Sequence, residues 1–198
     1  MANWNKWKKD TEFRPDRQKL DLARRLTLTN VQRQRLTKWG LYIAVILLAL
    51  VVQDVIMSQF SFLGATTDLV VCVLLLITVI EGTEVGTVFM LIASLFYYFS
   101  GSAPGPYIIA MLTFLGAAAA LFRQAWLHRN KVSILLCAGT ALMAYELGLF
   151  VVGIFMELTH WGRLPAFVLT GGYTFLVMIP AYDLLNKIGV IGGSTWKE

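Results

Sequence analysis

Acidic side chains within or beside apolar stretches are the residues of this sequence with the greatest potential for chemistry. The five candidates are Asp54, Asp68, Glu81, Glu84 and Glu146. A charged group in a membrane is costly, so each is a candidate for a transport role, a proton relay or a structural hydrogen bond. The first four lie near the ends of their stretches, where water is close, and we expect them to be structural. Glu84 would also benefit from the positive N-terminal end of the following helix.

Glu146 differs because it lies in the middle of its stretch. At 1.5 Å per residue it is about 15 Å along a helix from Met156. We predict that it faces the protein interior and hydrogen-bonds to another helix; the alternatives are a protonated carboxyl and a proton-relay role. Tyr173 lies at a similar depth in the next stretch and is the first candidate partner, and Gln53 is the second.

The sequence contains no recognisable catalytic or metal-binding pattern. The two histidines, His128 and His160, fall in connections on opposite sides of the expected membrane region, and Cys72 and Cys137 lie inside apolar runs as small core residues. There is no nucleophile turn, phosphate loop or dinucleotide fingerprint. We therefore predict no catalytic, cofactor-binding or metal-binding residues, and a protein that is not an enzyme. A basic N-terminal segment is the single feature that favours nucleic acid, and a membrane surface explains it better.

The composition indicates a membrane protein. Of 198 residues, 57% are apolar and only 15% are Asp, Glu, Lys or Arg. A soluble domain carries nearer a quarter of charged residues. The charge is also unevenly placed. Residues 1–38 contain eleven basic and four acidic residues, giving +7, and the remaining residues contain six and eight, giving −2.

Six stretches could cross a bilayer as helices, which need about 20 apolar residues. They are residues 39–57, 68–80, 85–99, 107–122, 132–156 and 164–185. Polar, Gly-rich or Pro-rich connections separate them, and Pro180 is expected to interrupt the last. A five-helix alternative would join the second and third stretches into one broken helix, but Glu81 and Glu84 between them argue against it. The predicted fold class is therefore an all-α integral membrane protein with six transmembrane helices.

The distribution of basic residues predicts the orientation. With an even number of spans and the N-terminus in the cytoplasm, 16 of the 17 Lys and Arg residues lie on the cytoplasmic side, and Arg163 is the exception. The predicted organisation is a basic cytoplasmic tail at residues 1–38, a membrane domain at 39–190 and a short cytoplasmic C-terminus at 191–198. Both termini are thus expected in the cytoplasm.

The N-terminal tail has the composition of a segment that lies against anionic lipid headgroups. Its residues with this expected role are Lys8, Lys9, Arg24, Arg25, Arg33 and Arg35. Basic residues near an anionic leaflet are attracted to it, and an amphipathic helix is permitted there. The alternative is a solvated tail that only enforces the orientation.

Residues 80–122, and more loosely 39–190, resemble the rod shape-determining protein MreD family. The marks of the resemblance are Glu81-Gly82, Gly86, the loop from Ser100 to Gly105, Tyr107, Arg123, the pairs Gln53-Asp54 and Asp68-Leu69, and Pro180 with the Tyr182–Leu185 stretch. The chain departs from the family at Tyr97 and Tyr98, where many members have an acid, and at Thr67, where many have proline. Roles tied to those positions are not transferred.

The resemblance implies a six-helix fold similar to the substrate-binding subunits of energy-coupling-factor transporters. It also implies a non-enzymatic role in the bacterial cell membrane, as part of the cell-elongation machinery that positions peptidoglycan synthesis with MreC-type partners. The alternative function is a vitamin-binding or other small-molecule-binding subunit of an energy-coupling-factor transporter. That function would require polar groups converging on an outward-facing pocket and a small-residue face on the first helix. Ala44 and Ala49 are five residues apart and do not form such a face.

Overall fold

The computed structural model of the chain describes residues 30–55, 65–126 and 130–191. The elements in this part of the chain are helical: α2 (Asn30–Val55), α3 (Leu69–Glu81), α4 (Thr83–Phe99), α5 (Tyr107–Trp126), α6 (Lys131–Phe155), the 3-10 turn η2 (Trp161–Arg163) and α7 (Leu164–Gly189). Each of the six apolar stretches predicted from the sequence is one helix. The all-α fold class is therefore confirmed for the described residues.

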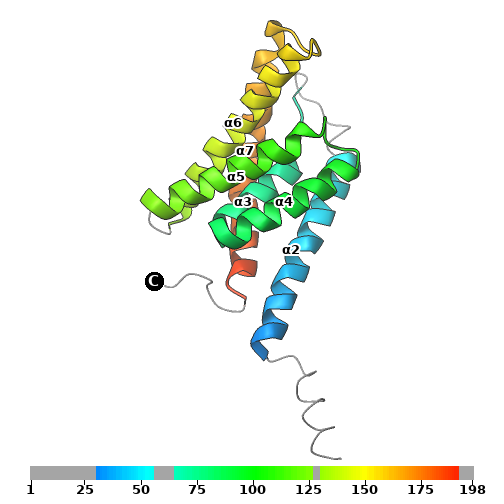
Figure 1. Ribbon diagram of the computed structural model, residues 1–198. Coiled ribbons are helices and arrows are strands. Elements are labelled where there is room, and N and C mark those ends of the chain that lie inside the picture. The colour runs from blue at the N-terminus through cyan, green and yellow to red at the C-terminus, as the bar shows by residue number, and fades with distance from the viewer. Residues whose placement is uncertain (1–29, 56–64, 127–129, 192–198) are drawn as a thin grey trace, which may run out of the picture.

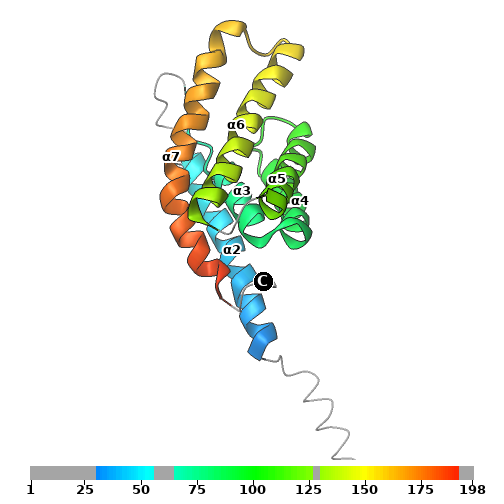
Figure 2. The ribbon, with the colours of Figure 1, turned by 90° about the vertical axis from the view of Figure 1, so that its left-hand side faces the viewer.

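Helix α3 lies at the centre of the bundle, and the other helices surround it (Figures 1 and 2). Its residues from Val70 to Glu81 are all buried. Going around it, α2 packs beside α7, α7 beside α6, α6 beside α5 and α5 beside α4. Ring contacts of Phe89 on α4 with Trp39 and Tyr42 on α2 close the circle. An almost uniformly apolar helix is stable here because protein covers it on every side.

The turn between α3 and α4 needs glycine at two positions. Gly82 is the single residue between the helices, and its φ of 93° lies in the region that favours glycine. Four residues later, a Cβ on Gly86 would lie 2.6 Å from the backbone oxygen of Thr78. A side chain at position 86 would therefore push α4 away from α3. Both glycines belong to the marks that resemble the MreD family.

Within the described residues, four helices are long and apolar enough to cross a membrane: α2, α5, α6, and α7 together with η2. The two shorter apolar helices, α3 and α4, extend about 20 and 26 Å at 1.5 Å per residue. All helices of the ring expose large apolar side chains, including Leu48, Phe96, Phe114, Phe155 and Leu176. Such extensive apolar exposure is what a lipid environment accommodates. The described chain therefore has the character of an all-α membrane protein.

Two details differ from the sequence prediction. Helix α7 continues through Pro180 from Leu164 to Gly189, so the predicted interruption is wrong. In a packed membrane bundle, neighbouring groups and local adjustments satisfy the carbonyl that a proline leaves without its N–H partner. Helix α2 begins at Asn30, so the end of the predicted polar tail is already helical, and Lys38 within it is buried.

Candidate ligand-binding cavity

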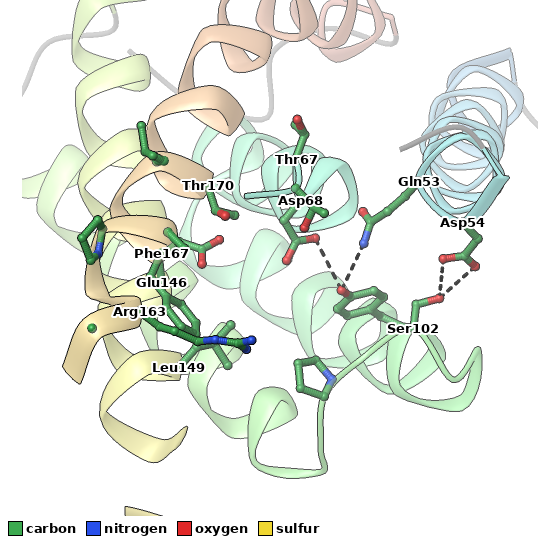
Figure 3. A pocket seen from close by; sticks show the side chains of 17 residues that line it. Gln53, Asp54, Thr67, Asp68, Ser102, Glu146, Leu149, Arg163, Phe167 and Thr170 are labelled. Carbon is green, nitrogen blue, oxygen red and sulfur yellow. Dashed lines mark hydrogen bonds between the residues drawn. The ribbon is translucent and has the colours of Figure 1, made fainter. Parts of the chain in front are cut away.

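A cavity of about 990 Å³ opens at the end of the bundle where α2, α4 and α6 end and α3 and α7 begin (Figure 3). Its volume lies at the upper end of the range that small-molecule sites occupy. Polar side chains from α2, the start of α3 and the α4–α5 loop line one side. The other side is formed by α6, η2 and α7. Segments that are distant in sequence therefore converge on one space.

The polar side is built around Gln53. Its amide oxygen accepts the backbone N–H of Val70 in the first turn of α3 at 2.9 Å, and its amide nitrogen donates to the hydroxyl of Tyr97 at 3.4 Å. The first N–H groups of a helix have no partner within it, so Gln53 supplies one from a neighbouring helix. The Tyr97 hydroxyl in turn donates to the carboxylate of Asp68 at 3.4 Å. This network joins α2, α3 and α4 at the cavity.

Asp54 and Asp68 are held in different ways. Both carboxylate oxygens of Asp54 accept the hydroxyl of Ser102, each at 2.9 Å, so that the α4–α5 loop is tied to the end of α2. The backbone N–H of Asp68 donates to Thr174 on α7 at 3.0 Å, which fixes the start of α3 against α7. The carboxylates of both residues line the cavity. The expectation that these acids reach water near helix ends agrees with this position.

Glu146 reaches the cavity from the middle of α6. Its side chain is directed into the bundle and is only 3% exposed, so the prediction that it faces the interior is confirmed. The carboxylate points into the cavity from the side opposite Gln53 (Figure 3). Its Oε1 atom is buried and has no hydrogen-bond partner among the described residues. A buried acceptor without a partner is uncommon and requires an explanation.

The predicted hydrogen bond from Glu146 to Tyr173 or Gln53 is not formed in the described part of the chain. Oε1 of Glu146 has no partner, and the amide of Gln53 is occupied by Val70 and Tyr97. Tyr173 is half-buried on α7 and is not among the residues that line the cavity. Glu146 does lie next to α7, where a Cβ on Gly171 would come within 3.5 Å of its Cγ, but depth along a helix does not determine which way each side chain points around the helix axis.

The opposite side of the cavity combines apolar surface with one basic group. Leu149 on α6 and Phe167 on α7 contribute the apolar part, and Arg163 at the end of η2 extends its guanidinium into the cavity (Figure 3). Arg163 is exposed, so it lies at the mouth, whereas Glu146 lies at the buried end. Three carboxyl groups and one guanidinium thus share this space.

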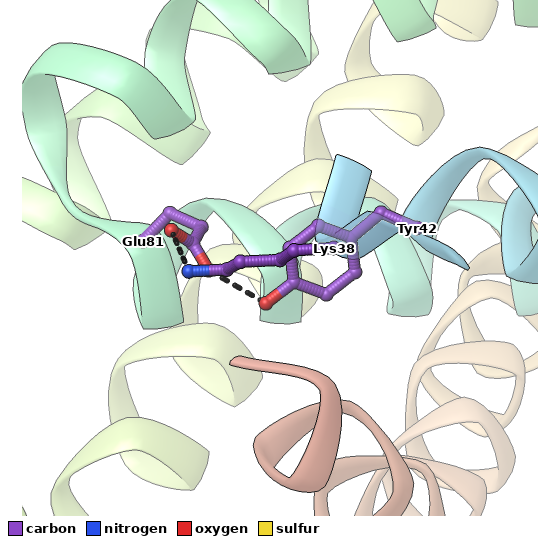
Figure 4. A network of polar contacts seen from close by, with 3 residues as sticks. All are labelled: Lys38, Tyr42 and Glu81. Carbon is purple, nitrogen blue, oxygen red and sulfur yellow. Dashed lines mark hydrogen bonds and ion pairs between the residues drawn. The ribbon is translucent and has the colours of Figure 1, made fainter. Parts of the chain in front are cut away.

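A different arrangement surrounds Glu81 at the other end of α3. Lys38 donates to the two carboxylate oxygens of Glu81 at 2.7 and 2.8 Å, and the hydroxyl of Tyr42 donates to Oε1 at 2.6 Å (Figure 4). The side chains of Lys38 and Glu81 are 5% and 1% exposed. This ion pair joins α2 to α3, and the structural role expected for Glu81 fits it. Glu84 is exposed in the first turn of α4, as predicted.

Two of the predicted membrane-surface residues belong to the described chain. Arg33 and Arg35 lie in the first turns of α2, and both are exposed. Lys8, Lys9, Arg24 and Arg25 lie outside the described residues. In the described part of the chain, no group of three or more His, Cys, Asp or Glu side chains could hold a metal ion. Cys72 and Cys137 are buried and unpaired, as core residues would be.

Sequence reasoning missed the cavity itself. Gln53 was a candidate partner of Glu146 and a mark of the family resemblance, and nothing in the sequence indicated that Ser102, Arg163 and Phe167 line a cavity, because they lie in a loop, a short turn and an apolar run. Comparison with models of known families, with curated proteins and with solved structures gives no match.

Proposed function

We propose that this protein is a non-enzymatic, multi-pass membrane component of the bacterial cell-elongation machinery, of the MreD type. It would act with an MreC-like partner and help to position peptidoglycan synthesis. The observation that carries this proposal is the use the fold makes of the residues that resemble the family. They tie helices to one another, as a scaffold requires.

Three of these ties illustrate the pattern. Gln53 of α2 accepts an N–H of α3, Glu81 of α3 pairs with Lys38 of α2, and Gly86 of α4 permits close contact with Thr78 of α3. Each tie includes the central helix. The resemblance also supports a fold similar to that of energy-coupling-factor binding subunits, with all six helices as spans. In that arrangement α3 need not match the full thickness of the bilayer, because protein covers it on all sides.

The proposed orientation places both termini in the cytoplasm, with the cavity on the outer side of the cell membrane. It can be tested by labelling intact cells with an impermeant thiol reagent, in a background where Cys72 and Cys137 are replaced by serine. Arg129→Cys should remain unlabelled, and Arg163→Cys, near the cavity mouth, should react. Labelling of position 129 with protection of position 163 would reverse the orientation.

The role in elongation is tested by depletion of the protein in its own rod-shaped host. We expect cells to round and to recover their shape when the wild-type chain is restored. Purification in mild detergent should retain an MreC-like protein, and a chain lacking residues 1–29 would show whether the tail takes part. Normal rod shape after depletion would contradict the proposal.

The cavity favours a second candidate, the binding subunit of a vitamin or small-molecule transporter. Such a subunit needs a pocket with converging polar groups, and Gln53, Asp68 and Glu146 meet in one. Uptake of radiolabelled vitamins in depleted cells distinguishes the two candidates. A specific uptake defect with unchanged cell shape would favour the transporter.

A further inference from the structure

The buried end of the cavity offers an acceptor that no described residue satisfies. Glu146 is 3% exposed, its Oε1 has no partner within the described chain, and its carboxylate points into the cavity (Figure 3). The carboxylate of Asp68 lines the same space. Burying a carboxylate without a partner is costly, and a bound donor carrying positive charge would remove most of that cost. The site therefore favours a cationic ligand.

The size of the cavity favours an organic cation over a metal ion. About 990 Å³ far exceeds the roughly 30 Å³ that one water molecule occupies in the liquid. The described residues also provide no group of three acidic, His or Cys side chains arranged for a metal. Leu149 and Phe167 present apolar surface on the wall opposite Gln53, which suits the carbon atoms of an organic molecule.

The unpaired oxygen of Glu146 favours a primary ammonium over a quaternary one. Oε1 of Glu146 lacks a hydrogen-bond donor, and a primary ammonium has three N–H groups to offer. A quaternary ammonium has none and could interact only through its charge. Arg163 extends into the mouth of the same cavity, where it can pair with an anionic group of the ligand.

We propose that this cavity binds a small zwitterion, with a primary ammonium against Glu146 and Asp68 and an anionic group at Arg163. This chemistry occurs in soluble phosphoethanolamine-like or amino-acid-like solutes and in the headgroup of phosphatidylethanolamine. The proposal adds a ligand site to the elongation role. If the protein is a transporter subunit, the zwitterion is the ligand class that it would bind, and in that case the proposal rests on the second proposed function.

The test uses the purified full-length protein and two pairs of probes that differ only in methylation of the ammonium. Phosphoethanolamine is compared with phosphocholine for protein in phosphatidylcholine nanodiscs, by calorimetric titration and by the midpoint of thermal unfolding. In a second arm, nanodiscs containing phosphatidylethanolamine are compared with nanodiscs of phosphatidylcholine alone. A ligand that binds only the folded state raises the midpoint. The arm that responds identifies the source as a soluble molecule or a lipid.

The variants test the assignment to this cavity. Glu146→Gln keeps the side-chain shape and should weaken binding of the responding ammonium probe by about tenfold or more. Glu84→Gln removes the same charge at an exposed site at the other end of α4, and it should bind like the wild type. Ala166→Phe occupies the cavity without changing any charge and should also abolish binding, which covers the case in which Glu146→Gln does not fold.

Three results would overturn the proposal: no response in either arm, equal responses to the primary and quaternary ammonium probes, or full binding by both Glu146→Gln and Ala166→Phe. These measurements are made on the purified protein and do not involve cell shape. Loss of the ligand proposal would therefore leave the elongation test unaffected, and loss of the elongation role would leave the binding result intact.

Discussion

Two glutamates, one toward each end of the bundle, are buried to the same extent and are treated in opposite ways by their surroundings. Glu81 is 4% exposed and Glu146 is 3% exposed. Glu81 receives donors from Lys38 and from Tyr42 within 2.8 Å. Glu146 has an oxygen without any partner in the described chain, and it borders a cavity of about 990 Å³.

A buried charge with a structural role differs from one available to a ligand in the partners that surround it. A buried ion pair with additional hydrogen bonds compensates for its own desolvation, and it fixes how the elements that carry it pack. An unpaired carboxylate beside a cavity retains the capacity to bind. The first arrangement holds α2 against α3, and the second leaves an acceptor of Glu146 available where several helices meet.

The largest expected effect is from breaking the pair at Glu81. Glu81→Gln leaves the Lys38 ammonium buried without a counter-charge, which should lower the free energy of unfolding by about 3–5 kcal/mol. Unfolding by denaturant in mild detergent measures it. Glu84→Gln, on an exposed side chain three residues later, should change stability by less than about 0.5 kcal/mol. Similar small losses for both variants would contradict a structural role for the pair.

The next effect compares one tyrosine from each end. Tyr42→Phe removes a 2.6 Å hydrogen bond to the charged Glu81 and should cost about 1.5–3 kcal/mol. Tyr97→Phe removes two contacts of 3.4 Å, to Gln53 and Asp68, and should cost less than about 1 kcal/mol. The same unfolding assay gives both values. A larger loss for Tyr97→Phe would mean that the cavity wall is tied more firmly than the ion-pair end.

The positions of the helices were predictable from the sequence, because length, hydropathy and breakers act locally. The Pro-rich and Gly-rich residues 100–106 separate α4 from α5, and Gly82 separates α3 from α4, as expected. The partners of the polar residues were not predictable. Lys38 and Glu81 are 43 residues apart, and Lys38 was assigned to the basic cytoplasmic tail because the residues before it are mostly polar.

The cavity was missed for a related reason. Depth along a helix can be counted in residues, and this count led to the pairing of Glu146 with Tyr173. The direction in which each side chain points depends on the rotation of α6 and α7 about their axes, and packing of the whole bundle determines that rotation. The cavity requires the relative placement of several helices and loops, and hydropathy contains no information about that placement.

A third prediction concerns Glu146 without ligand. Glu146→Gln preserves the shape of the side chain and removes a charge that lacks a compensating partner. We expect the free energy of unfolding to change by less than about 1 kcal/mol, or to increase, because a neutral amide is less costly to bury than a carboxylate. Glu146→Lys should be more destabilising, because an ammonium at this 3% exposed position costs more to bury than a neutral amide, and α7 lies close, since a Cβ on Gly171 would come within 3.5 Å of the Glu146 Cγ. A loss above about 3 kcal/mol for Glu146→Gln would show that Glu146 is structural, like Glu81.

The smallest effect should come from another ion pair among the described residues, in which the two charges are paired but not buried. Lys131 at the start of α6 donates to Asp183 of α7 at 2.7 Å, the same distance as in the Lys38–Glu81 pair. Its side chains, however, are 46% and 57% exposed. Water and salt screen such a pair, and measured exposed pairs contribute about 0–1 kcal/mol.

Asp183→Asn should therefore lower the free energy of unfolding by less than about 0.5 kcal/mol, and raised salt should remove that difference. The loss for Glu81→Gln should persist in the same salt, because its pair is shielded from solvent. Equal sensitivity of the two variants to salt would mean that water reaches Lys38 and Glu81, and the distinction between the two ends of the bundle would then have to rest on Glu146 alone.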